Sequence, residues 1–457
     1  MKWGDFMSIL KTFAGGVHMP EYKELSEKQA IEEQKEPSKV VIPLNQHVGA
    51  ECTPLVKKGD FVREGQKIGD SDASLFAPVH ASISGIVRDI GKVYTTGGWL
   101  VNSITIEKAS DEELEALGNP NCSELLMEGY GDFRNLSKEK IIELIKEAGI
   151  IGMGGGAFPS FAKIQSSDDG TIDTIIINAA ECEPFLTCDH RMMLEYSDRM
   201  IGGLRIVMKY LNVSSAYIGI EDNKKDAIDL LEEKLKDDKF IKVAVLKTKF
   251  PQGDAYRMVD SILGRKVPQG GRTKNVNTFV SNVGTFVAIY DAVTFGHASH
   301  KRVVTVTGNG VKAPKNINAY VGTSIRDLVE EAGGFNGDVT KVIVGGPMTG
   351  VAQYSLDTPI SKNTSGIILL TDNDYKDQEE SQCIKCGKCV DACPVHLMPL
   401  YISRYQELGN LKMCDKYNAQ SCIVCGSCSF VCPAKRFLAE RISAAKREIK
   451  QSLRRSR

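Results

Sequence analysis

Residues 383–394 read CIKCGKCVDACP, and residues 422–433 repeat the pattern as CIVCGSCSFVCP. Each stretch has the spacing C-x2-C-x2-C-x3-C-P, in which one tight loop supplies three thiolates to a [4Fe–4S] cluster. The fourth ligand comes from elsewhere, and where two such runs occur together the last cysteine of each run serves the other cluster. The sequence therefore predicts a ferredoxin-like domain with two clusters, one held by Cys383, Cys386, Cys389 and Cys432 and the other by Cys393, Cys422, Cys425 and Cys428.

Structural zinc binding is the other chemistry that clustered cysteines support. Zinc sites usually combine two C-x2-C pairs, or cysteine with histidine, and a doubled four-cysteine run with proline fits that pattern poorly. A disulfide framework suits a short secreted chain rather than one local cluster in a long one. The insert between the runs, residues 394–421, is longer than a minimal ferredoxin needs and is expected to add helix, with Cys414 as a bystander.

The composition is that of an ordinary folded protein. The 457 residues suggest about three domains, and 42% hydrophobic with 25% charged residues excludes a disordered or fibrous chain. With 57 basic and 58 acidic side chains, the net charge of −1 gives no general case for nucleic-acid binding. The apolar run at the amino terminus is too short for a signal peptide, and no stretch reaches the ~18 apolar residues of a membrane span. We therefore expect a cytosolic or peripheral protein whose partners supply any membrane-spanning part.

Turn signals and hydrophobic periodicity divide the chain into a multidomain α/β protein. Short strands separated by glycine and proline between residues 40 and 106 indicate a compact β barrel or sandwich. Strands that alternate with helical patterns after residue 173, among them one long helix at 191–211, indicate a largely parallel sheet. The expected domains are an arm (1–39), a β domain (40–110), an α/β domain (111–300), a small α+β unit (301–355), the two-cluster domain (375–436) and a basic tail (437–457).

The densest glycine run, GMGGGAFP at residues 152–159, marks a candidate binding loop. Glycine lets a backbone approach a phosphate or a planar ring closely, and successive N–H groups can cradle an anion. A helical pattern precedes this loop and no Gly-Lys-Ser/Thr follows it, so it is neither an ordinary Rossmann fingerprint nor a P-loop. Lys163 follows where it could reach a phosphate or a flavin oxygen, and the plainer interpretation is a flexible connection. The candidate glycines are Gly152, Gly154, Gly155 and Gly156.

A second candidate loop, NAAECEP at residues 178–184, follows a predicted buried strand. The carboxyl ends of parallel strands are where α/β sheets bind ligands. Glu181 and Glu183 could accept hydrogen bonds from a flavin ring or from ribose hydroxyls, and could equally belong to a solvated loop. A third candidate is SNVGT at residues 281–285, where polar groups are set in an apolar context.

These three motifs together resemble the flavin-binding module shared by the C subunit of the Rnf complex and the NADH-binding subunit of respiratory complex I. TFAGGVHMPEYK at residues 12–23 and the doubled cysteine run favour the Rnf C-subunit family, and the resemblance extends from about residue 12 to residue 432. It implies a non-covalently bound FMN with a nicotinamide site stacked over it. One departure is Ala180, where the complex I module has an acidic residue that contacts the flavin. By motif matching, FMN would be held by Gly154, Gly155, Lys163, Asn178, Glu181 and Asn282, and the dinucleotide would be faced by Phe158 and Glu183.

Two further segments also resemble known units, and a third has a distinctive charge pattern. Residues 56–87 are similar to a biotinyl/lipoyl-type barrel-sandwich hybrid, but no lysine lies between Gly69 and Ala81 to carry a prosthetic group, so a scaffold is expected. Residues 302–350 resemble an SLBB β-grasp unit, for which we expect a packing role. The segment 434–457 has nine basic and two acidic residues in a helical pattern, which suits anionic lipid, an acidic partner or a solvated helix end.

The resemblance implies an NAD(H)-binding flavo-iron–sulfur subunit of a membrane-bound, ion-translocating ferredoxin:NAD oxidoreductase. Hydride would pass between NAD(H) and FMN, and single electrons through two [4Fe–4S] clusters, so the cofactors carry the chemistry and no catalytic side chain is predicted. The expected partners are membrane-embedded subunits and a ferredoxin-like iron–sulfur subunit at the cytoplasmic face of the membrane, with no nucleic acid. The alternatives are a cobalamin reductase-like flavo-iron–sulfur protein, a non-catalytic electron-wiring module without flavin, and a ligand sensor built on the β-grasp unit.

Overall fold

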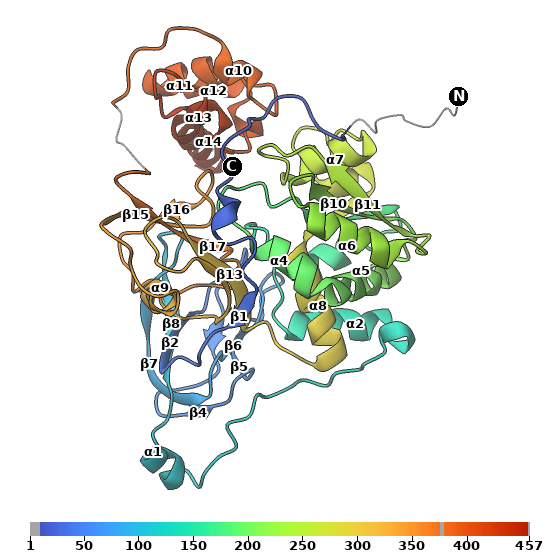
Figure 1. Cartoon of the computed structure of the whole chain (residues 1–457), viewed down its shortest axis with the longest axis vertical. Helices are drawn as coiled ribbons and strands as arrows, with labels where there is room; N and C mark the ends of the chain where they lie inside the picture. Colours follow the sequence, from blue (N-terminus) through green and yellow to red (C-terminus); the bar gives the residue numbers. More distant parts are fainter. Residues whose placement is uncertain (1–9, 375–378, 456–457) are drawn as a thin grey trace.

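A computed structural model describes residues 10–374 and 379–455, and in it the α/β domain lies beside two β units with the ferredoxin-like helices above them (Figure 1). The first nine residues of the predicted arm, residues 375–378 at the start of the predicted two-cluster domain, and residues 456–457 of the tail lie outside the described residues. The fold class predicted from the sequence, a multidomain α/β protein with this order of domains, is confirmed.

The α/β domain is built on a four-stranded parallel sheet with the order β11-β10-β9-β12. Ile175, Ile176 and Ile177 of the central strand are fully buried because helices cover both faces of the sheet. α7 (Ala255–Leu263) covers one face, and the other is covered by α2 (Lys138–Glu147), α4 (Cys188–Glu195), α5 (Ser197–Leu211), α6 (Lys225–Leu235) and α8 (Val283–Phe295). The strands are β9 (Thr174–Ala179), β10 (Ala216–Glu221), β11 (Ile241–Leu246) and β12 (Thr278–Asn282).

The prediction of one helix over residues 191–211 is wrong. α4 ends at Glu195 and α5 begins at Ser197, with Tyr196 between them at φ −117° and ψ 24°. The N–H of Tyr196 still donates to the carbonyl of Met192, so a single residue leaves the helical conformation and the apolar periodicity continues across the break. Neither proline nor glycine marks the break in the sequence.

The amino-terminal β domain is a sandwich of two small antiparallel sheets. One has the order β2-β8-β7-β4 and the other β3-β5-β6, and their inward side chains, such as Ile42, Ile68 and Ile104, form one buried core. The long hairpin of β7 and β8 extends beyond this core. The strands are β2 (Lys39–Pro43), β3 (Thr53–Pro54), β4 (Phe61–Val62), β5 (Lys67–Asp70), β6 (Val79–His80), β7 (Gly85–Tyr94) and β8 (Leu100–Glu107).

A six-stranded mixed sheet with the order β1-β14-β13-β17-β15-β16 forms the second β unit. Its edge strand β1 (Ile31–Glu33) is contributed by the arm and pairs in parallel with β14. Because β1 has only three residues, the sequence pattern did not reveal it. The other elements are β13 (Lys301–Thr307), β14 (Lys315–Tyr320), α9 (Ile325–Glu331), β15 (Val339–Val344), β16 (Val351–Ala352) and β17 (Gly366–Thr371).

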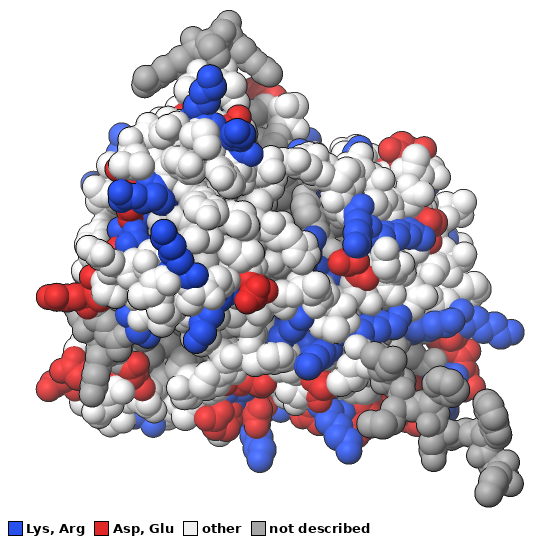
Figure 2. All heavy atoms as spheres, turned by 90° about the horizontal axis from the view of Figure 1, so that it is seen from above, with Lys and Arg blue, Asp and Glu red and all other residues white. Residues whose placement is uncertain are grey.

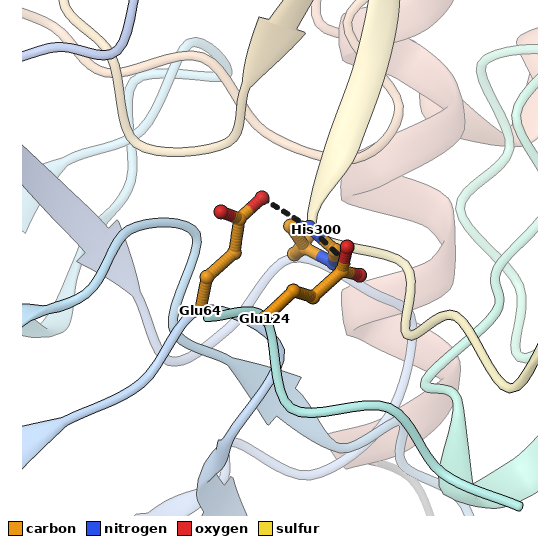
Figure 3. A group of neighbouring side chains, drawn as sticks. All are labelled: Glu64, Glu124 and His300. Atoms are coloured by element: carbon orange, nitrogen blue, oxygen red, sulfur yellow. Dashed lines mark hydrogen bonds and ion pairs between the residues drawn. The ribbon is translucent and has the colours of Figure 1, made fainter. Parts of the chain in front are cut away.

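An ion cluster joins the two β units at the start of β13. Nε2 of the buried His300 lies 3.0 Å from Oε1 of Glu64 in the sandwich and 3.6 Å from Oε1 of Glu124 in the connection that follows it (Figure 3). Lys301 adds an ammonium 3.1 Å from Glu64. Burial opposes ionisation of Glu64, but the hydrogen bonds and charges of His300 and Lys301 outweigh burial and lower the pKa of Glu64. The cluster therefore fixes the sandwich against the six-stranded sheet.

The ferredoxin-like domain is helical, and the insert between its cysteine runs forms α11 and α12, as predicted. Leu438, Ile442 and Ile449 of the tail helix α14 are at most 4% exposed within this domain, so most of the apolar face of the tail is packed inside the protein, whereas Leu453 near its end is exposed. Seen from above, basic and acidic side chains both occur on this end of the molecule (Figure 2). No helix within residues 10–374 and 379–455 has the length and apolar character needed to cross a bilayer. The helices are α10 (Lys388–Asp391), α11 (Pro399–Glu407), α12 (Leu411–Lys416), α13 (Ser427–Phe430) and α14 (Leu438–Arg455).

The arm connects three of these parts. The N–H of Gly16 donates to the carbonyl of Ala392 in the ferredoxin-like domain, and the N–H of Val17 donates to the carbonyl of Phe250 in the α/β domain. The arm then reaches the six-stranded sheet as β1. One continuous segment therefore contacts three structural units.

Candidate flavin and iron–sulfur site

A cavity of about 650 Å³ opens at the carboxyl ends of the neighbouring strands β9 and β12. Residues of the six-stranded sheet unit, residues 96 and 97 at the tip of the β7–β8 hairpin, and Cys425 complete its wall. The cavity is thus formed by all four parts of the chain. All the residues singled out as cofactor-binding from the sequence line it, namely Gly152, Gly154, Gly155, Gly156, Phe158, Lys163, Asn178, Glu181, Glu183 and Asn282.

The glycine loop presents bare backbone to this cavity. A Cβ added at Gly155 or Gly156 would meet no atom within 4 Å, whereas one at Gly154 would lie 3.2 Å from Asn282. Gly155 has φ +94°, a conformation that L side chains rarely adopt. Side chains at these positions would occupy the space that a ligand needs, so the loop fits a flat or anionic group held by main-chain contacts.

Lys163, on α3 (Ser160–Gln165), is a partly buried cation at the cavity wall. Its ammonium donates to the carbonyl of Val280 and lies 5.2 Å from the centroid of the Phe279 ring. Burial lowers the pKa of Lys163 to about 8. An anionic phosphate is a partner that would stabilise this ammonium, so the lysine and the glycine loop together fit the phosphate and ring of FMN.

The acidic loop, which connects β9 to α4 and carries Glu181 and Glu183, is held against the first turn of α4. Oε1 of Glu181 accepts from the N–H of Asp189 at 2.7 Å, and Oε2 accepts from the N–H of His190 at 3.2 Å. A carboxylate at a helix amino terminus is stabilised by the unpaired N–H groups and the helix dipole. The side-chain amide of Asn178 donates to the carbonyl of Gly253 at 2.7 Å, which fixes the other end of the strand–loop junction.

Asp189 is a site residue that sequence reasoning missed. It lies at the cavity, and its Oδ2 accepts from the side-chain amide of Asn282 at 2.6 Å. Burial, and then the charge of Glu181, raise the pKa of Asp189 to about 6. Nothing in its local spacing marks it, because Asp189 lies on α4 and its partner Asn282 ends the distant strand β12. Ala180, the departure from the complex I pattern, is fully buried, whereas the carboxylate of Asp189 lines the cavity.

Glu183 is engaged by the six-stranded sheet unit. Its Oε2 accepts from the N–H of Met348 at 3.0 Å, and its Oε1 accepts from the hydroxyl of Thr349. Burial raises the pKa of Glu183. The buried Arg302 of β13 reaches the glycine loop, where it donates to the carbonyl of Met153 at 3.2 Å. The SLBB-like unit, for which we expected only a packing role, therefore contacts both the glycine loop and the acidic loop.

The cysteines form two groups in space. One small cavity is lined by Cys383, Cys386, Cys389 and Cys432. Of these four cysteines, Cys383 and Cys386 are exposed to solvent. In the second group, burial raises the pKa of Cys422, Cys425 and Cys428, and the charge of Cys393 raises the pKa of each further. Each group thus combines three thiols of one run with the last thiol of the other. Cys414 is buried in a hydrophobic cluster that also includes Cys393 and Cys422, and its thiol lies against the carbonyl of Ile402.

This fold and this site define a flavo-iron–sulfur electron-transfer protein. The Nuo51 FMN-binding domain family matches residues 145–291, and the 4Fe-4S dicluster domain family matches residues 382–436. The RnfC barrel sandwich hybrid domain family matches residues 11–111, and the SLBB domain family matches residues 303–352. The chain belongs to the RnfC family, the C subunits of the Rnf ferredoxin:NAD+ oxidoreductase complexes.

Two relatives show how far the similarity extends. The C subunit of the proton-translocating ferredoxin:NAD(+) oxidoreductase complex of Clostridium ljungdahlii is 44% identical over 396 residues, covering 86% of this chain and 84% of that one. Its counterpart from the Na(+)-translocating complex of Acetobacterium woodii is 40% identical over 438 residues, covering 96% and 97%. Among solved structures, an NAD+-reducing [NiFe]-hydrogenase in the H2-reduced state matches with a TM-score of 0.46 and 15% identity, covering 75% of this chain and 67% of that chain.

Proposed function

We propose that this chain is the NAD(H)-binding flavo-iron–sulfur subunit of an ion-translocating ferredoxin:NAD+ oxidoreductase. The observation that carries the proposal is the single cavity shared by the glycine loop, the acidic loop and Cys425. Because the flavin site and the cluster ligand Cys425 would line the same cavity, electrons could pass from the flavin to that cluster without an intervening domain.

Bound FMN supplies the exchange between the two-electron chemistry of NAD(H) and one-electron transfer. The side chains of this protein position the cofactors. In the proposal, Lys163 and the glycine loop hold the phosphate and ring, and Phe158 and Glu183 face the dinucleotide. Asn178, Glu181 and Asn282 are fixed by hydrogen bonds within the protein, which suits a preorganised site.

The cysteine geometry supports an order for the two clusters. Cys425 lines the flavin cavity, so the cluster of Cys393, Cys422, Cys425 and Cys428 is the nearer one. Cys383 and Cys386 of the other group are exposed, as is Ile384 between them. We assign the exposed cluster to exchange with the next redox carrier, a ferredoxin-like or membrane-embedded subunit at the cytoplasmic face of the membrane.

The test is an anaerobic NADH titration of the purified chain after reconstitution with iron, sulfide and FMN, followed by visible absorbance and electron paramagnetic resonance. We expect loss of the flavin band at stoichiometric NADH, followed by signals of reduced clusters. A matched sample without FMN should leave the clusters oxidised. Clusters that become reduced without FMN, or a bound flavin that NADH does not reduce, would contradict the proposal.

A further inference from the structure

Lys23 of the arm has its ammonium buried directly beneath the acidic loop. The residue is 4% exposed, and Nζ donates to the carbonyl oxygens of Leu186 at 2.6 Å, Glu181 at 2.8 Å and Glu183 at 3.1 Å. An ammonium has three N–H groups, and each of them here has one carbonyl partner. The whole hydrogen-bonding capacity of this side chain therefore serves the backbone of one loop.

The loop needs such a donor to keep its shape. Glu181 has φ +47° and Phe185 has φ +70°, so two non-glycine residues lie in the left-handed region. That conformation is disfavoured for a residue with a side chain, because its Cβ lies too close to the backbone. Buried carbonyl groups without donors would add a further penalty. Contacts from outside the loop must therefore stabilise this conformation.

A second buried lysine acts on the neighbouring carbonyl. Lys224 is 1% exposed, and its Nζ donates to the carbonyl oxygen of Ala180 at 2.7 Å and to Oδ1 of Asn223 at 2.9 Å. Its ammonium also lies 3.4 Å from the carboxylate of Glu221. Two ammonium groups thus hold the backbone of the loop, one from the α/β domain and one from the arm.

The arm stays attached to the loop by contacts that do not involve the ammonium of Lys23. The N–H of Phe185 donates to the carbonyl of Glu21 at 2.7 Å, and the ring of Tyr22 stacks on Phe185 with centroids 4.6 Å apart. The hydroxyl groups of Ser26 and Thr187 lie 2.8 Å apart. Removal of the ammonium should therefore release the loop carbonyls while the arm remains docked.

We propose that Lys23 is a positioning residue for hydride transfer, because its ammonium fixes the loop that carries Glu181 and Glu183 at the cavity. The inference rests on the proposed function of that cavity. Hydride transfer requires the two rings in close and aligned contact, and a misplacement of about 1 Å can slow a reaction by about 100-fold. Lys23 itself touches only protein and takes no part in the chemistry.

The decisive experiment uses the full chain loaded with clusters and FMN, with Lys23 replaced in Lys23→Met. Anaerobic stopped-flow absorbance should show flavin reduction by NADH slowed about 10- to 100-fold per bound flavin, with a raised KM for NADH. Iron content, FMN content and the rate of flavin reduction by dithionite should stay within twofold of the wild type. Lys28→Met, at an exposed position of the same arm, is the matched control and should behave like the wild type.

Lys23→Arg is the second variant, because it keeps the positive charge and is the milder change. A planar guanidinium does not reproduce three convergent donors, so we expect a reduction rate between those of Lys23→Met and the wild type. Wild-type rates per bound flavin in both variants, or an equal loss in Lys28→Met, would overturn the inference. Loss of flavin or iron with an unchanged rate per remaining flavin would also overturn it, since Lys23 would then be structural. A wild-type flavin that NADH does not reduce would instead refute the proposed function.

Discussion

Gly155→Ala gives a quantitative test of the glycine loop. Gly155 has φ +94° and no atom within 4 Å of an added Cβ, so alanine introduces backbone strain without a steric clash in the free protein. The strain of a side chain in this region is about 1–2 kcal/mol. In the absence of ligand the exposed loop can relax, and FMN binding must then restore the strained conformation. Since 1.4 kcal/mol corresponds to tenfold, this strain alone should raise the Kd for FMN about 5- to 30-fold, and contact between the added methyl group and FMN would raise it further.

The assay is an equilibrium titration of cluster-loaded, flavin-free protein with FMN, followed by quenching of flavin fluorescence. Gly170→Ala is the matched control, because Gly170 has φ +75°, no atom within 4 Å of an added Cβ, and a position away from the cavity. It should impose similar local strain and leave the Kd unchanged. The reasoning is refuted if Gly155→Ala binds FMN within twofold of the wild type, or if Gly170→Ala weakens binding equally.

Three further predictions concern the same cavity. Because burial lowers the pKa of Lys163 to about 8 and a phosphate would raise it again, FMN binding should take up a proton, and affinity should fall up to tenfold per pH unit above pH 8. Titrations at several pH values should show this slope in the wild type and its absence in Lys163→Met. Glu183→Gln should lower NADH turnover about tenfold or more with little change in FMN content, and equal loss of both would move Glu183 to the flavin-binding set. Cys425→Ser should leave flavin reduction by NADH intact but slow electron delivery to an external one-electron acceptor, with one cluster signal altered, and an unchanged delivery rate would contradict the cluster order.

Local patterns predicted most of the architecture. The parallel sheet follows from buried apolar strands such as β9 and from amphipathic helices such as α2, whose signals lie within a few consecutive residues. The glycine run and the family resemblance together indicated ten residues, and all ten line one cavity in the structure. The spacing of the cysteines predicts two groups of ligands, because the geometry of a cubane cluster constrains where its ligands lie.

The parts that could not be predicted depend on contacts between distant segments. Asp189 is recognised at the cavity only when the fold brings its carboxylate to the side-chain amide of Asn282 on β12. Similarly, Met348 contacts Glu183 only after the six-stranded sheet unit has packed against the α/β domain. The break at Tyr196 has no proline or glycine to signal it. Likewise, Lys23 looks like one more charge in a polar arm until the loop carbonyls converge on it.

The arm also has a consequence for how the protein is made. It leaves the ribosome before the domains that it contacts, yet the carbonyl that receives the N–H of Gly16 belongs to Ala392 in the ferredoxin-like domain. At a synthesis rate of ~5–20 residues per second, about 20 to 80 s separate the translation of these two residues. The arm therefore cannot complete its contacts until the α/β domain, the six-stranded sheet and part of the ferredoxin-like domain exist, and assembly of the holoprotein is expected to be largely post-translational.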